Sequence, residues 1–198
     1  MMPAGSATLA ILIALVLGFG GGWLFKKEST TSTTTTTTTA PVIDGSTTTT
    51  TTTPRALACS GAVLSGSVIT SQGAAGTIQV SFLVANVGAK ACTIHGYPML
   101  QLLSSNMTAM TTTTVNGMAA FGPAAANAAP KTQHVAVGGH VEFVLQYSHV
   151  PSGTETTCPT AASVNVYPPN SATPFNVVTA IDACNLGTLN VSPFFAAT

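Results

Sequence analysis

The sequence predicts an all-β sandwich domain at residues 56–198, preceded by a membrane segment at residues 1–28 and a threonine-rich stalk at residues 29–55. Three observations predict this order. An uncharged apolar run lies near the N-terminus, an almost pure Ser/Thr tract follows it, and the remaining chain alternates apolar and polar residues in short stretches. Alternation with period two indicates strands that are buried on one face.

The apolar run covers residues 7–25, which are 19 residues without a charge, and Lys26 and Lys27 close it. As a helix it would span about 28 Å, close to the roughly 30 Å hydrocarbon core of a bilayer. No Lys or Arg precedes it and no A-x-A pattern follows it, which favours an uncleaved anchor over a cleaved signal peptide. We therefore predict a single-pass protein of the cell membrane, which would be secreted if the segment were cleaved.

The Ser/Thr tract at residues 29–55 is of low complexity and has almost nothing to bury. It predicts a disordered stalk of the kind that carries O-linked sugars. The two lysines after the apolar run would by themselves keep the domain in the cytoplasm. Four cysteines without a close pair argue instead for disulfides in an oxidising compartment, and against zinc. We therefore expect the domain on the extracytoplasmic side.

Charge is scarce in the predicted domain, which holds only Lys90, Lys131, Glu142, Glu155 and Asp182. The formal net charge of the chain is zero, so no basic face for nucleic acid is predicted. One Asp and two Glu leave little material for acid–base catalysis, and no G-x-S-x-G pattern is present. We predict a protein that is not an enzyme and uses no cofactor.

Strict alternation predicts strands at residues 76–87, 140–147, 163–167 and 175–179. The inward faces of the two longer strands carry Ile78, Val80, Phe82, Val84, Val141, Phe143, Leu145 and Tyr147. Turns rich in Gly and Pro separate the strands, and no helical periodicity follows residue 56. This pattern is typical of a sandwich of antiparallel strands.

A first hairpin is predicted at "VAVGGHVEFVLQY", centred on Gly138-Gly139, because two glycines suit a primed turn. A second hairpin is predicted around residue 171, the midpoint between Cys158 and Cys184. It would set Val164 opposite Val178 and Val166 opposite Asn176. It would also bring the two cysteines together, so we expect a Cys158–Cys184 disulfide and, by remainder, a Cys59–Cys92 disulfide.

The stretch "ACTIHGYPMLQLL", residues 91–103, is interpreted as a structural corner. Cys92 would tie an incoming strand to the start of the domain, and Gly96-Tyr97-Pro98 would bend the chain. Pro98 tolerates only an edge or a bend, and the apolar residues after it would enter the core.

The sequence resembles the actinobacterial domain-of-unknown-function family numbered 4232 at two blocks. The first block is Cys92, Thr93, Ile94, Gly96, Tyr97 and Pro98, and the second is Val166, Tyr167, Pro168 and Pro169. The glycines at 138 and 139 and the late Cys184 extend the match to about residues 58–195. The resemblance implies an immunoglobulin-like sandwich at the cell envelope and implies no activity. Many relatives carry a lipid anchor, which this sequence lacks.

Two functions of different classes follow. The main hypothesis is a non-enzymatic envelope protein that displays its domain to an unknown extracytoplasmic ligand or envelope component, with residues 104–130 as the contact loop. The alternative is a copper-binding domain, because thioether and imidazole groups suit copper in an oxidising compartment. Its candidate ligands are His95, Met99, Met107, Met110, Met118, His134 and His140. Glu142 is the nearby candidate for a third ligand if His134 and His140 hold a metal ion. His149, before Pro151, is interpreted as a surface residue, and Phe194 and Phe195 as residues that close the core.

Overall fold

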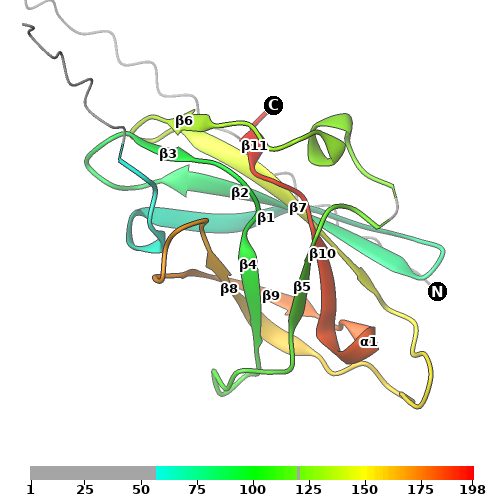
Figure 1. Cartoon of the computed structure of the whole chain (residues 1–198). Helices are drawn as coiled ribbons and strands as arrows, with labels where there is room; N and C mark the ends of the chain where they lie inside the picture. Colours follow the sequence, from blue (N-terminus) through cyan, green and yellow to red (C-terminus); the bar gives the residue numbers. More distant parts are fainter. Residues whose placement is uncertain (1–56, 120) are drawn as a thin grey trace, which may run out of the picture. The chain divides into compact units, whose positions relative to one another are not determined.

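The computed structural model describes residues 57–119 and 121–198 (Figure 1). The anchor and the stalk predicted at residues 1–28 and 29–55 lie outside the described residues. In the described part of the chain, no helix is long and apolar enough to cross a membrane. Residues 51–198 form a compact unit that contains the described core and both disulfides. This unit therefore has what a domain needs to fold by itself.

Strands make up nearly all of the regular structure. Their bounds are β1 Leu64–Ala74, β2 Thr77–Asn86, β3 Cys92–Ile94, β4 Met99–Leu103, β5 Thr113–Asn116, β6 Gln133–Val135, β7 His140–Ser148, β8 Ala161–Tyr167, β9 Phe175–Ile181, β10 Thr188–Val191 and β11 Phe195–Ala196. Two 3₁₀ turns, η1 Gly61–Val63 and η2 Ala124–Asn127, and one short turn, α1 Cys184–Gly187, complete the fold. Two residues inside α1 have left-handed φ angles of 55°, so α1 is a left-handed turn and not a regular helix.

The larger sheet has the strand order β1-β2-β7-β10-β5, and β11 pairs with the same edge of β7 as β10. Its pairs are antiparallel, except that β5 lies parallel to β10. A smaller antiparallel sheet has the order β4-β8-β9, and β3 and β6 form a two-stranded ribbon. One hydrophobic cluster draws side chains from both sheets, so the fold is an all-β, sandwich-like arrangement.

Stacked aromatic rings occupy the centre of this core. The rings of Phe82 and Phe143 are parallel, with centroids 4.7 Å apart, and Phe194 meets Phe143 edge to face at 5.4 Å. Phe194 and Phe195 are buried, with 1% and 8% of their surfaces exposed. The expectation that the C-terminal phenylalanines close the core is confirmed for Phe194, whereas Phe195 packs in a separate small cluster with Ala126 and Val144.

The edge of β4 in the smaller sheet is covered by threonines that lead into and form β5. The hydroxyl of Thr114 accepts the amide hydrogen of Leu100 at 3.0 Å, and the hydroxyl of Thr112 accepts that of Leu102 at 3.0 Å. These bonds satisfy backbone groups that an edge strand otherwise exposes. They also join the two sheets along one side of the sandwich.

The four strands predicted from alternation are present as β2, β7, β8 and β9. The hairpin of β8 and β9 is also confirmed, but its register differs by one residue from the predicted one. Val164 lies opposite Val177, because an irregularity between Ala161 and Ser163 shifts the pairing. An extra residue in one strand changes which residues face each other, and the midpoint between two cysteines carries no information about it.

The predicted hairpin at Gly138-Gly139 is wrong. A turn does occur there, with a φ angle of +71° at Gly138, but β6 before it pairs with β3 while β7 after it pairs with β2. The reason is Asn86, which is fully buried. Its backbone N–H donates to the Gly139 carbonyl at 3.0 Å, its carbonyl accepts from the Gly138 N–H at 2.9 Å, and its side chain donates to the Val135 carbonyl at 3.1 Å. The turn is therefore anchored on β2.

Candidate functional site

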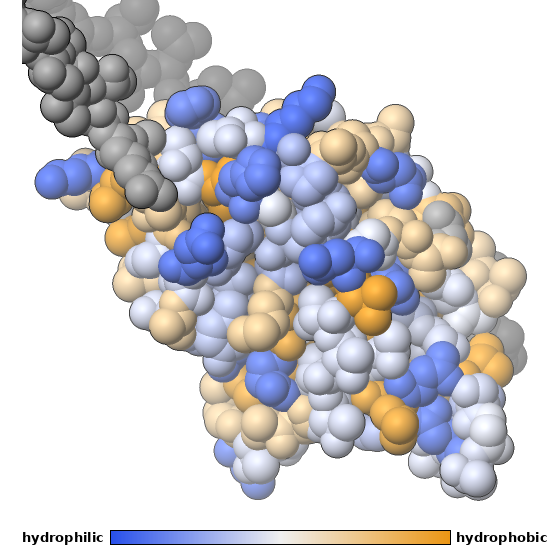
Figure 2. Space-filling model, in the orientation of Figure 1, coloured by the Kyte–Doolittle hydropathy of each residue, from blue (hydrophilic) through white to orange (hydrophobic). Residues whose placement is uncertain are grey.

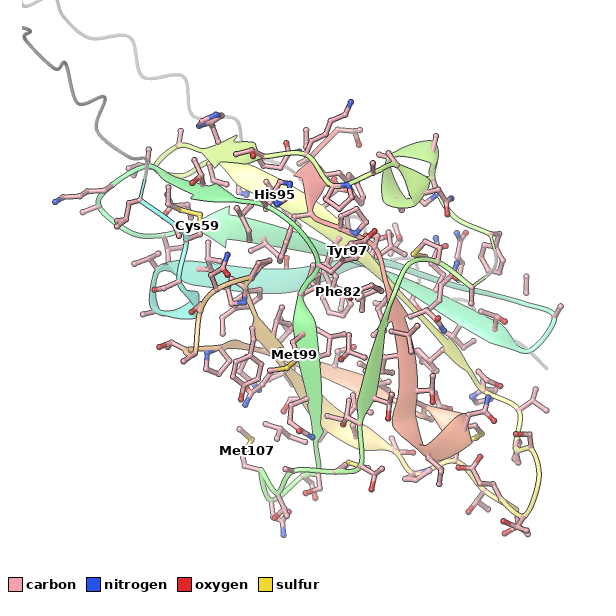
Figure 3. The ribbon with its side chains drawn as sticks, in the orientation of Figure 1. Cys59, Phe82, His95, Tyr97, Met99 and Met107 are labelled. Carbon is pink, nitrogen blue, oxygen red and sulfur yellow. A yellow bond between two sulfur atoms is a disulfide. The ribbon has the colours of Figure 1, made fainter. Side chains whose placement is uncertain are left out.

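The two sequence blocks that carry the family resemblance meet at one end of the sandwich. Met99, directly after the first block, lies opposite Tyr167 of the second block in the pairing of β4 with β8. A Cβ atom at Gly96 would lie 3.6 Å from the Cγ atom of Pro169. Residues about 70 positions apart in the sequence therefore form one corner of the molecule. Figure 3 labels His95, Tyr97 and Met99 of the first of the two segments.

The first block is held in place by the Cys59–Cys92 disulfide, whose Cα atoms are 5.0 Å apart. Beside it, the N–H of Cys59 donates to the carbonyl of Thr93 at 2.9 Å, and the N–H of Thr93 donates to the carbonyl of Leu57 at 2.8 Å. Gly96 has a φ angle of +110°, which a residue with a side chain rarely adopts. Its carbonyl accepts the N–H of the buried Phe194 at 2.9 Å, so the bend is fixed to the core. The interpretation as a structural corner is correct.

The second block ends in a tight turn over residues 168–171. The N–H of Ser171 donates to the carbonyl of Pro168 at 3.0 Å, and Asn170 has a φ angle of +63°. A type II turn requires a positive φ at its third residue, which Asn170 supplies, and proline is common at its second residue, here Pro169. The Thr173 carbonyl then accepts the N–H of Gly61 at 3.1 Å, which ties this loop to the start of the domain.

Two open clefts flank this turn and share Pro169 and Asn170. The tyrosine cleft has a volume of about 410 Å³ and is lined by Tyr97, Met99, Tyr167, Pro168, Pro169, Asn170, Ser171 and Ala172. The histidine cleft has a volume of about 430 Å³ and is lined by Leu57, Ala58, Thr93, His95, Thr132, Pro169 and Asn170. Both volumes lie in the range of small-molecule binding sites.

The lining of both clefts contains no Asp, Glu, Lys or Arg. On the face of the molecule shown in Figure 2, strongly hydrophilic residues are scattered and do not gather into one patch. Among the described residues, no protein group is hydrogen-bonded to the hydroxyls of Tyr97 and Tyr167 or to the side chains of His95 and Asn170. The clefts therefore present hydrogen-bond donors and acceptors that are available to a ligand.

A second polar cluster lies at the opposite end of β9. The Asp182 carboxylate accepts the hydroxyl hydrogen of Tyr147 at 3.2 Å and lies 2.5 Å from Nδ1 of His149. Burial, together with the neighbouring charge of Asp182, raises the pKa of Tyr147 well above its usual range, so the phenol stays protonated. Sequence reasoning missed this cluster, because nothing in the spacing of these residues indicates that β7 and β9 end side by side. Both carboxylate oxygens are engaged within the protein, which fits a group that braces two strands.

The Cys158–Cys184 disulfide, predicted from the sequence, lies near this cluster and has a Cα–Cα distance of 4.6 Å. The turn α1 follows it, and the Glu155 carboxylate accepts the N–H groups of Asn185 at 2.7 Å and of Leu186 at 2.9 Å. These backbone hydrogen bonds hold the pKa of Glu155 below its usual value, and the bond from Leu186 contributes more than the bond from Asn185. The carboxylate thus fills the concave backbone of the left-handed turn.

The candidate copper ligands do not come together. Met110 packs against the main core, Met118 packs against a separate small cluster, and Met107 is 60% exposed with its sulfur near the hydroxyl of Ser163. His134 lies opposite Thr93 in the ribbon of β3 and β6, and His140 opposite Ala85 in the larger sheet. Among the described residues, no group of three or more His, Cys, Asp or Glu side chains could hold a metal ion. The copper alternative has no support from this arrangement.

The predicted contact loop at residues 104–130 is not a single loop. It contains a tight turn closed by the hydrogen bond from the Ser104 N–H to the Thr108 carbonyl at 2.9 Å, then β5 and η2. The parallel pairing of β5 with β10 could not be read from a run of threonines.

Fold and site together define a small, disulfide-braced all-β domain with neutral clefts at one end. The chain belongs to the family described as Domain of unknown function (DUF4232), whose family model matches residues 59–194. No curated protein matches the chain, and no solved structure matches it.

Proposed function

We propose that this protein is a non-enzymatic binding protein of the cell envelope and that the two corner clefts are its binding site. One observation carries the proposal. The two sequence blocks of the family resemblance, at residues 92–98 and 166–169, meet at clefts whose polar side chains have no hydrogen-bond partner among the described residues. Those groups sit on a rigid frame of strands, a disulfide and a type II turn, the arrangement on which binding loops are usually presented.

Residues 1–28 act in this proposal as a membrane anchor and residues 29–55 as a stalk, with the domain on the extracytoplasmic side. Both disulfides support that compartment, because such bonds persist in oxidising surroundings. The packing of two sheets around one core supports the immunoglobulin-like assignment that the resemblance suggested. A membrane-impermeant amine reagent added to intact cells should label the exposed Lys90 and Lys131, and labelling only after lysis would contradict the proposed orientation.

The binding site is tested with residues 51–198 and isolated envelopes of the cells that make the protein. A glutamate is placed in the tyrosine cleft as Met99→Glu and, as the matched control, on the same sheet outside the clefts as Val178→Glu. Both side chains are exposed, at 57% and 84%, and both strands are sheet edges, so the two variants carry the same charge at similar structural cost. Envelope binding should fall in Met99→Glu and persist in Val178→Glu. Equal binding by both variants would refute the clefts as the binding site.

A further inference from the structure

We propose that the joined corner clefts bind a neutral oligosaccharide. This inference rests on the proposed binding function and names the class of ligand. Charge gives the first argument. None of the five charged residues of the domain lines either cleft, so a charged ligand would lose its hydration without meeting an opposite charge. A neutral ligand avoids this cost.

The polar groups of the clefts fit sugar hydroxyls, each of which both donates and accepts a hydrogen bond. The phenols of Tyr97 and Tyr167 and the imidazole of His95 can do both, and the Asn170 amide offers donors and an acceptor in one plane. Asn170 lines both clefts, so a single amide can contact neighbouring units of a chain.

Sugar rings also have apolar faces made of C–H groups. The apolar side chains of the tyrosine cleft can pack against these faces. Tyr97 and Tyr167 are half-buried, so each ring is held by the protein while part of it remains open to the cleft. Met99 is 57% exposed beside them, and Pro169 forms the boundary with the second cleft. An aromatic side chain with an apolar body and a polar tip can contact both the face and the hydroxyls of a sugar.

The shape of the site favours a chain of sugar units over one small molecule. The two clefts have similar volumes, about 410 and 430 Å³, and meet at Pro169 and Asn170. Both are open to solvent along the corner of the molecule. A linear ligand can therefore occupy both clefts and continue beyond them.

The rigidity of the frame lowers the cost of binding. The type II turn at residues 168–171, the Cys59–Cys92 disulfide and the Gly96 bend are already ordered through their own hydrogen bonds. Little conformational freedom is then lost when a ligand binds, so modest contacts suffice for measurable affinity.

The test titrates residues 51–198 by calorimetry with a panel of neutral oligosaccharides of two to six units. The panel comprises gluco-, manno-, galacto-, arabino- and N-acetylglucosamine oligomers. The test variant is Asn170→Gly, because glycine keeps the left-handed backbone and removes only the amide. The control is Asn185→Gly, the same change at another exposed left-handed position, in α1 beyond the opposite end of β9.

We expect at least one oligomer to bind, Asn170→Gly to weaken that binding by about threefold to tenfold as for the loss of one hydrogen bond, and Asn185→Gly to leave it unchanged. Absence of binding by every oligomer up to about 10 mM would overturn the inference, and so would equal losses in both variants. Tight binding of a proline-rich peptide, blocked by Met99→Glu, would replace the sugar by a peptide ligand.

Periodate treatment separates this inference from the proposed function, because periodate cleaves the vicinal diols of sugars. Envelope binding that depends on Met99 and disappears after the envelopes are treated supports both. Internal N-acetylglucosamine units linked through O4 lack a vicinal diol, so displacement of the bound envelopes by each oligomer of the panel is measured as well. Binding that depends on Met99, survives periodate and is displaced by no oligomer overturns the saccharide while the binding function stands. Binding that does not depend on Met99 overturns both.

Discussion

The two disulfides should contribute nearly equal amounts to global stability but should act on different ends of the molecule. The paired cysteines are separated by 33 residues for Cys59–Cys92 and by 26 residues for Cys158–Cys184. The chain-entropy relation then gives about 3.7 and about 3.5 kcal/mol for the two bonds. Replacing both cysteines of either pair by alanine should lower the free energy of unfolding by about these amounts, a large part of a typical total of roughly 5–15 kcal/mol.

Local stability should distinguish the two variants. The segment before Cys59 is held against β3 by the disulfide and by the hydrogen bonds that join Thr93 to residues 57 and 59. Without the Cys59–Cys92 disulfide, only those hydrogen bonds hold residues 57–59 against β3. This segment should then detach locally while the rest of the domain stays folded. The Cys158–Cys184 variant retains the disulfide at this edge and should open there only when the whole domain unfolds.

Urea denaturation of residues 51–198 gives the global values, and amide hydrogen exchange at residues 59 and 93 gives the local ones. Strong loss of protection at these two amides should occur in the Cys59–Cys92 variant alone. The two variants should have similar global stability. Equal protection of the amides of residues 59 and 93 in both variants would refute the view that the Cys59–Cys92 disulfide holds the part of the histidine cleft formed by residues 57, 58 and 93.

Three further outcomes are expected. Asn86→Ala should lower the free energy of unfolding by about 1–3 kcal/mol in urea denaturation, because the carbonyl of Val135 loses its buried donor; an unchanged midpoint would show that the side chain does not hold the turn. Tyr147 has a folded-state pKa raised above its ordinary value of 10.0, so the unfolded state binds fewer protons above that pH and stability should fall as pH rises, by at most about 1.4 kcal/mol per pH unit. Tyr147→Phe should remove that dependence, and an identical slope would contradict the assignment. Glu155 has a pKa lowered from 4.5, so its contribution is present above that pH and is lost as the pH falls. The protection factors of the Asn185 and Leu186 amides, which correct for the pH dependence of intrinsic exchange, should therefore fall in acid in the wild type. In Glu155→Gln these protection factors should be low at every pH.

Alternation revealed the strands that have one large apolar face, and little else of the fold. In β2 and β7 every second residue is large and apolar, because that face meets the core. In β1, by contrast, serines alternate with few large apolar residues, and most of the strand is exposed, so no pattern marks it. The ribbon of β3 and β6 depends on the hydrogen bonds of Asn86, which no local pattern encodes.

The cysteine pairing could be predicted because a hairpin brings symmetric positions together, even though its register differed by one residue. The corner at Gly96 was also predictable, since Gly and Pro restrict the backbone in known ways. The clefts were not, because they arise from the pairing of β4 with β8, whose residues are far apart in the sequence. Residues 104–130 were predicted to be a contact loop because the segment is long and has no alternating pattern. Strand β5 within it could not be predicted, because it forms by pairing with β10, which is distant in the sequence.

The central claim is that the corner clefts face the ligand in the living cell, and site-specific photo-crosslinking tests it most directly. A benzophenone amino acid replaces Met99 in the tyrosine cleft or, as the control, Val178 on the same sheet, where the side chain is 84% exposed. The full chain is produced in its own cells and irradiated. The account predicts an adduct with an envelope component from position 99 and none from position 178. Adducts from position 178 alone, or equally from both positions, would contradict it.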